Sequence, residues 1–252
     1  MVSLDATWSG HVFDSVLEGD GIAAVDEPTV AWLAEHRQPV LTAVMRAAST
    51  IGSPACAAVI AMLICALVAW RIGRWLLAVV AVLGMAGFAL TDTVLKLVVH
   101  RQRPPLPYSV VTAHGYSFPS GHAMGIATSA LISAWALNHW ILRSTATRIA
   151  TWTSAIAMII GVGFSRVYLG VHYRTDVIAG WDLGGIWASA VIMFAAVSER
   201  SSAIRSAAVT QHHRLRRSIS PSEYRQRPRF SDHCGMPQAR EFGDDHRPPG
   251  QS

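Results

Sequence analysis

Basic residues, histidines and one aspartate gather at three places along the chain, each beside the end of a long apolar segment. The groups are Lys96 with Arg103-Pro104, then Pro119-Ser120-Gly121-His122, and finally Ser165-Arg166 with His172 and Asp176. Ionisable residues at the ends of membrane spans are costly to keep there, so each is a candidate for function. The three groups therefore predict one site, built from parts that are distant in the sequence.

The cations of these groups predict that the site binds an anion. Lys96, Arg103 and Arg166 converge without a matching cluster of carboxylates, so they require an anion. Arginine forks match phosphate oxygens, and lysine adds a point charge. Ser120 and Gly121 open a helix whose free N–H groups also favour an anion. The pattern predicts a binding site for a phosphoryl group.

The two histidines supply what phosphoryl transfer needs, a nucleophile and an acid for the leaving oxygen. Asp176 follows His172 by four residues, so on a helix the carboxylate would hold one ring nitrogen and leave the other facing phosphorus. His122 then remains as the general acid. The sequence contains no DxD or HExxH set, so we expect no metal and no other cofactor.

The elements that position these residues are membrane helices. The chain has 252 residues, 51% hydrophobic and only 15% charged, which excludes an ordinary soluble domain and a disordered chain. Five apolar segments are long enough to cross or nearly cross a bilayer. They are Ile51–Trp70, Trp75–Val99, His122–Leu142, Ile149–Tyr168 and Val177–Ser198. The predicted fold is an all-α polytopic transmembrane bundle with its core in residues 51–198.

The distribution of basic residues predicts the orientation. The connections at 71–74 and 143–148 and the tail are basic, which places them in the cytoplasm of a multi-pass protein of the inner or plasma membrane. The loops at 101–121 and 166–176, and with them the site, then face outward. Residues 1–50 form an acidic extracytoplasmic or interfacial segment, in which 25–44 either lies on the membrane or follows a first span lost with an upstream start.

Residues 199–252 form the third region, a basic tail with ten arginines and six acidic residues. Its composition predicts a disordered cytoplasmic segment that fixes the orientation. Binding of anionic lipid headgroups is the alternative, and no nucleic acid partner is expected. The oligomeric state is not predicted.

Taken together, the three groups resemble the type 2 phosphatidic acid phosphatase family, which shares its three-part motif with vanadium haloperoxidases. Every motif position matches in order between Lys96 and Asp176. The resemblance implies that Lys96, Arg103, Arg166, Ser120 and Gly121 bind phosphate, that His172 forms a phosphohistidine, that Asp176 orients it and that His122 is the acid. It also implies a metal-independent enzyme with six core helices, where this chain shows five.

Two residues near the motifs are interpreted separately. Arg174 stands where relatives often have proline, and an exposed, solvated arginine is the expected state. Asp92 lies four residues before Lys96, so a structural ion pair along the helix is expected.

The expected function is hydrolysis of a membrane lipid phosphate or diphosphate at the outer face. Candidate substrates, by resemblance, are a polyprenyl diphosphate such as the undecaprenyl carrier of cell-wall synthesis, phosphatidic acid and phosphatidylglycerol phosphate. A phosphotransferase with the same site, a vanadium haloperoxidase and a non-catalytic lipid or anion transporter are the alternatives. The apolar spans count against the haloperoxidase, whose relatives are soluble.

Overall fold

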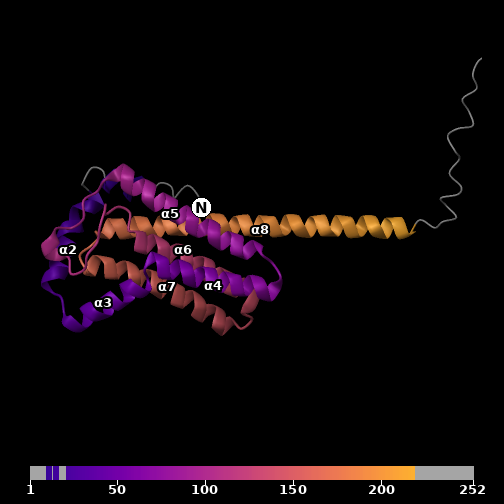
Figure 1. Cartoon of the computed structure of the whole chain (residues 1–252), viewed down its shortest axis with the longest axis horizontal. Coiled ribbons are helices and arrows are strands. Elements are labelled where there is room, and N and C mark those ends of the chain that lie inside the picture. The colour runs from indigo at the N-terminus through magenta and orange to yellow at the C-terminus, as the bar shows by residue number, and fades with distance from the viewer. Residues whose placement is uncertain (1–9, 13, 17–20, 219–252) are drawn as a thin grey trace, which may run out of the picture. The chain divides into compact units, whose positions relative to one another are not determined.

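The computed structural model describes residues 10–12, 14–16 and 21–218, and all regular structure within them is helical. The helices are α2 (Asp26–Glu35), α3 (Pro39–Ile51), α4 (Pro54–Ile72), α5 (Leu76–Val99), α6 (Gly121–Ala136), α7 (Thr145–Tyr168) and α8 (Arg174–Ser218) (Figure 1). Short turns lie at Gly21–Val25 (η1) and Leu106–Tyr108 (η2), and a π-helical turn lies at Leu137–Ile141 (η3). Residues 10–12 and 14–16 are also helical. The described residues up to Arg200 form one compact unit, and the described residues 201–218 belong to a second.

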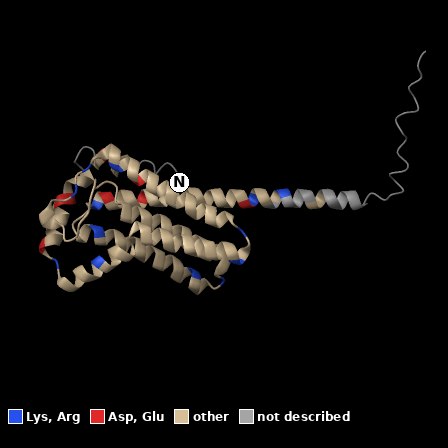
Figure 2. Ribbon diagram, viewed as in Figure 1, with Lys and Arg blue, Asp and Glu red and all other residues tan. Residues whose placement is uncertain are grey.

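Among the residues that the structure describes, four helices are long and apolar enough to cross a membrane: Pro54–Ile72, Leu76–Val99, Thr145–Tyr168 and Arg174–Ser202. They coincide with four of the five predicted spans. The remaining predicted span begins with α6, whose 16 residues are few for a crossing, but α6 runs directly into η3 and so continues to Ile141. In residues 1–200, acidic and basic residues concentrate toward the helix ends, with long uncharged stretches between them (Figure 2).

The helix α6 lies at the centre of the bundle. It contacts α4, α5 and α7, and twelve of its sixteen residues are buried. On α8, Gly180 and Gly184 lie against the α6 backbone, where an added Cβ would come within 2.8 Å of the Ser120 oxygen and 2.6 Å of the Met124 oxygen. Glycines one turn apart allow this close approach of two helices. This close packing therefore fixes the position of the first turn of α6 relative to α8.

The N-terminal region forms two helices rather than one surface helix over 25–44. The break falls at residues 36–38, and Pro39 starts α3 at a position where its missing N–H costs nothing. The helix α3 packs against α7. The predicted outward location of this region, and an upstream span, stay predictions.

The tail prediction is wrong for residues 199–218. Disorder was expected from residue 199, but α8 continues through Ser218. Arginine and alanine are good helix formers, and they continue the helix that Arg174 begins. The rest of the predicted tail, residues 219–252, lies outside the described residues.

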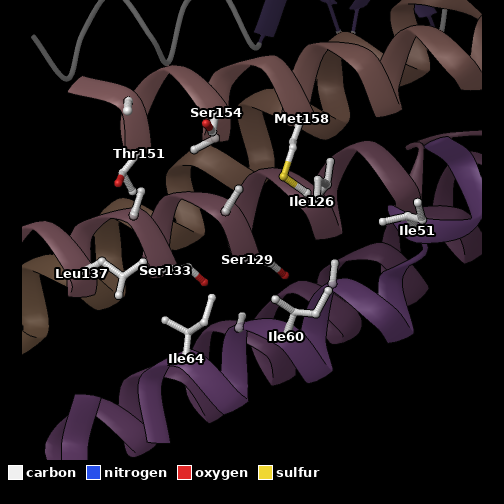
Figure 3. A pocket seen from close by; sticks show the side chains of 16 residues that line it. Ile51, Ile60, Ile64, Ile126, Ser129, Ser133, Leu137, Thr151, Ser154 and Met158 are labelled. Carbon is white, nitrogen blue, oxygen red and sulfur yellow. The ribbon is translucent and has the colours of Figure 1, made fainter. Parts of the chain in front are cut away.

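An apolar groove runs between α4, α6 and α7. Its volume is about 330 Å³, and isoleucine side chains of α4 face α6 and α7 across it (Figure 3). The hydroxyl groups of Ser129 and Ser133 are its polar features on α6 (Figure 3). The groove begins at Ile126, about one helical turn after His122 on α6, and extends from there toward Leu137.

Candidate active site

All eight predicted site residues lie at one end of the bundle. The helices α5 and α7 end there, with Lys96 and Arg166 in their last turns. The helices α6 and α8 begin there and carry Gly121 and Asp176 in their first turns. Because successive spans alternate in direction, motifs far apart in the sequence meet at the same end.

His172 and Asp176 form the buried centre of the site. The side chains are 3% and 0% exposed, and Nδ1 of His172 lies 3.5 Å from Oδ2 of Asp176. The same oxygen accepts hydrogen bonds from the Tyr173 backbone N–H (2.9 Å) and from the Ser117 hydroxyl. His172 precedes α8, so the pair does not share one helix as expected. The contact instead joins a loop to the first turn of that helix.

Arg103 holds the other nitrogen of the histidine. Its Nη1 lies 3.1 Å from Nε2 of His172 and donates at 2.8 Å to the carbonyl of Val171. Its remaining nitrogens donate to the carbonyls of His114 and Gly115, each at 3.0 Å. A guanidinium has no acceptor, so Nε2 is the acceptor and the ring proton sits on Nδ1, toward Asp176. This is the tautomer that a nucleophilic Nε2 requires.

The protonation state of His172 follows from its surroundings. The pKa of His172 is lowered to about 4, chiefly by burial and also by the charges of Arg103 and Arg166, while Asp176 opposes the shift. The ring is therefore neutral at pH 7, with the Nε2 lone pair available once the guanidinium moves.

Ser120 offers a hydroxyl that the protein leaves unused. It stands at the N-cap of α6, but its side chain makes no capping bond, and Oγ is buried without a hydrogen-bond partner in the described part of the chain. Its backbone N–H donates to the Asp176 carbonyl at 2.9 Å, which ties the second motif to the third. A buried hydroxyl without a partner is costly, so its position indicates a ligand.

The three predicted cations differ in how they are paired. Lys96 donates to Asp92 at 2.6 Å, so the expected ion pair along the helix is confirmed and the expectation of three unmatched cations is wrong for Lys96. Arg166 is 6% exposed, bonds the Ser49 hydroxyl through Nη1, and leaves its buried Nε unpartnered among the described residues. Within that same part of the chain, neither Arg166 nor Arg103 makes an ion pair. These two arginines carry the uncompensated charge.

Gly121 and His122 complete the arrangement. A Cβ on Gly121 would lie 3.0 Å from Oδ1 of Asp92 and 3.2 Å from Nζ of Lys96, so the missing side chain lets this ion pair reach the start of α6. His122 is partly exposed, and Arg166, His172, Lys96 and Arg103 are all close enough to act on it electrostatically. His122 thus lies near the cations and the second histidine.

Sequence reasoning missed several residues of the site. Arg101 donates to Asp176, Ser117 bonds the other oxygen of that carboxylate, and Asp26 bonds Arg101 from the N-terminal region. Arg101 lies two residues before Arg103, and the sequence did contain a signal for it. It is an arginine in a loop predicted to face outward, where the distribution of charge predicts few basic residues. Ser117 and Asp26 gave no comparable signal. Arg174, expected to be solvated, donates to the Ile22 carbonyl at 3.0 Å and is partly buried.

Metal binding was not expected here. No group of three or more histidine, cysteine, aspartate or glutamate side chains that could hold a metal ion occurs within the residues that the structure describes. Metal independence stays a prediction.

The helical bundle and the site at its end define a multi-pass membrane protein with a cationic, histidine-containing centre. Residues 75–200 match the PAP2 superfamily, and the chain belongs to it. The predicted resemblance is confirmed.

Two curated relatives match parts of the chain. Undecaprenyl-diphosphatase of Sulfolobus acidocaldarius is 40% identical over 74 residues, which is 29% of this chain and 31% of that protein. Phosphatidylglycerophosphatase B of Bacillus subtilis is 36% identical over 96 residues, 38% of this chain and 46% of the relative. The matches thus span less than half the length of either relative.

Two solved structures share the fold. A transmembrane PAP2 type phosphatidylglycerolphosphate phosphatase from Bacillus subtilis superimposes with a TM-score of 0.69 at 26% identity, covering 75% of this chain and 94% of that one. Aquifex aeolicus LpxE gives a TM-score of 0.50 at 20% identity, over 67% and 95% of the two chains, and supports the fold alone.

Proposed function

We propose that the protein is a metal-independent membrane phosphatase that hydrolyses a lipid phosphate or diphosphate through a phosphohistidine. The observation that carries the proposal is the neutral His172, whose Nε2 faces Arg103 while its Nδ1 faces Asp176. An imidazole that is fixed at Nδ1, and whose Nε2 meets a guanidinium that a bound phosphate can draw away, is suited to attack phosphorus.

The proposed reaction has two steps. The phosphate group binds between Arg103 and Arg166, accepts a hydrogen bond from the free hydroxyl of Ser120, and draws Arg103 away from Nε2 of His172. Nε2 then forms a bond to phosphorus as the bond to the leaving oxygen breaks, and His122 gives that oxygen a proton. In the second step water attacks the phosphohistidine, His122 takes a proton from the water, and inorganic phosphate leaves with His172 restored.

The substrate class follows from the position of the site. The site lies at the ends of apolar helices, so a lipid can keep its tail in the bilayer while its phosphate reaches the cationic pocket. The names of the curated relatives favour undecaprenyl diphosphate and phosphatidylglycerol phosphate as the first substrates to assay. Phosphatidic acid is the third candidate.

The deciding experiment measures phosphate release by the purified protein in detergent with EDTA present. We expect release from at least one of the three lipids, and loss of release in His172→Ala. The matched control is His114→Ala, which removes an exposed histidine side chain from the same end of the bundle and keeps the backbone carbonyl that Arg103 uses. Normal release by His172→Ala would refute the phosphohistidine.

The alternative functions give different results in the same samples. A phosphotransferase would move ³²P from the lipid into a lipid or sugar product rather than into free phosphate. A transporter would sustain lipid or anion flux in vesicles and release no phosphate, and it has no use for His172 and Asp176 beside a second histidine.

We also propose that the site faces outward. Leu106 is 88% exposed in the loop before α6, whereas Trp75 is 71% exposed at the opposite ends of the spans. In a variant without native cysteines, an impermeant maleimide is expected to label Leu106→Cys but not Trp75→Cys in intact cells. The reverse pattern would invert the orientation.

A further inference from the structure

A buried carboxylate from the N-terminal region reaches the catalytic end of the bundle. Asp26, the first residue of α2, is 2% exposed. Its Oδ1 accepts from the backbone N–H of Thr175 at 3.2 Å, and its Oδ2 accepts from the Thr175 hydroxyl and from Nη2 of Arg101 at 2.8 Å. Residues separated by about 150 positions in the sequence thus share one buried network.

Arg101 connects this carboxylate to the proposed catalytic one. Its Nη1 donates to Oδ1 of Asp176 at 2.6 Å and to the Thr175 hydroxyl at 2.7 Å. Its guanidinium carbon lies 4.4 Å from the centre of the Tyr173 ring. The two prongs of the guanidinium therefore bridge Asp26 and Asp176, and the stacked ring fixes its plane.

The two oxygens of Asp176 are divided between two tasks. Oδ1 is held by Arg101, which leaves Oδ2 for Tyr173 N–H, Ser117 and His172. A carboxylate fixed at one oxygen cannot rotate away at the other. Removing the arginine would also leave two buried carboxylates without their shared cation, which is strongly unfavourable.

We propose that Asp26 and Arg101 are positioning residues, which hold the Asp176 carboxylate in the orientation that keeps Nδ1–H of His172 in place. The inference rests on the proposed function and adds to it a part for the N-terminal region in catalysis. The route runs from Asp26 to Arg101, from Arg101 to Asp176 and from Asp176 to His172.

Attachment of the N-terminal region does not by itself require this network. Arg37 fastens the same region through hydrogen bonds to the carbonyls of Tyr168 (3.0 Å) and Tyr108 (2.5 Å). Arg37 makes no contact with Asp176. It therefore supplies a control in which the attachment is weakened and the orienting network is left intact.

The kinetic test compares Asp26→Ala, Arg101→Gln, the double variant and Arg37→Gln, all as full chains in detergent. For Asp26→Ala and Arg101→Gln we expect kcat to fall by about 10- to 100-fold with KM nearly unchanged, because neither residue faces the phosphate pocket. The double variant should lose little more than Arg101→Gln alone, since the two residues act in series. Arg37→Gln should keep its kcat and show a lower melting temperature.

A second measurement, by NMR, detects the Nδ1–H proton of His172 directly and does not require the protein to be active. In protein with ¹⁵N-labelled histidine, the hydrogen-bonded Nδ1–H of His172 gives a downfield proton resonance, assigned by its loss in His172→Ala. We expect this resonance to be lost in Arg101→Gln and Asp26→Ala and kept in Arg37→Gln.

The outcomes separate the inference from the proposed function. Equal loss of kcat in Arg37→Gln, additive effects in the double variant, or an unchanged resonance in Arg101→Gln would each overturn the positioning role. If the wild-type protein releases no phosphate, the proposed function is overturned. If the resonance is nevertheless present in the wild type and lost in Arg101→Gln, the positioning network still stands.

Discussion

The packing of α8 against α6 gives a sharp prediction from a single added methyl group. In Gly184→Ala the new Cβ would lie 2.6 Å from the Met124 oxygen and 2.8 Å from Cβ of Ala127. Carbon atoms in contact need about 3.5 Å, so the two helices must separate by about 0.7 Å. Overpacking of this kind costs about 1–3 kcal/mol.

The displacement has a consequence for activity because each helix carries part of the site. Asp176 lies about two turns above Gly184 on α8, and Ser120 and His122 lie at the start of α6. A misplacement of about 1 Å can cost about 100-fold in rate, so we expect kcat to fall on the order of 10-fold. The melting temperature in detergent should fall as well.

The neighbouring glycine is the matched control. A Cβ on Gly185 would meet no atom within 4 Å, so Gly185→Ala adds the same methyl group to the same helix without a clash. We expect its kcat and melting temperature to equal or slightly exceed those of the wild type. If the two alanine variants behave alike in both measurements, the reasoning from helix separation is refuted.

Three further predictions concern the site itself. Ser120→Ala should leave the melting temperature unchanged or higher, because its buried hydroxyl has no partner among the described residues, while kcat/KM falls about 10- to 100-fold through the lost bond to a charged phosphate. Arg103→Lys should lower kcat/KM at least as much, because one ammonium cannot replace donors to three carbonyls and to Nε2; kinetics equal to the wild type would exclude the guanidinium from catalysis. The pKa of His172, about 4 in the fold against about 6.5 when unfolded, means that the unfolded chain binds the extra proton in this window. The free energy of unfolding should therefore decrease as the pH falls from about 6.5 to 4, and His172→Asn should flatten that dependence in denaturant titrations.

The sequence predicted where these residues converge better than it predicted the N-terminal and C-terminal elements. Motif spacing and alternating spans were sufficient to place Lys96, Arg103, Ser120, Arg166 and His172 at one end of the bundle, because a membrane span fixes where both of its ends must lie. The ion pair of Lys96 followed from helix periodicity alone.

Other features had no local signature. The contact between Asp26 and Arg101 joins residues 75 positions apart, and nothing in the spacing of the N-terminal region indicates which buried partner its aspartate meets. The continuation of α8 past residue 199 was hidden by a composition typical of disorder, although helix propensity there is high. A tertiary contact determines the partner of Asp26, and the preceding helix determines the continuation of α8, so composition alone predicts neither.

The hydrogen bond between Arg103 and Nε2 of His172 has a consequence for the reactivity of the histidine. An unprotonated imidazole nitrogen is a good ligand for transition metals and an easy target for electrophiles. In the absence of an anion, that lone pair is already occupied by a cation, which repels metal ions and covers the nitrogen. The proposed nucleophile is thus accessible only to a ligand negative enough to attract the guanidinium away, so the contact that fixes the histidine would also protect it between turnovers.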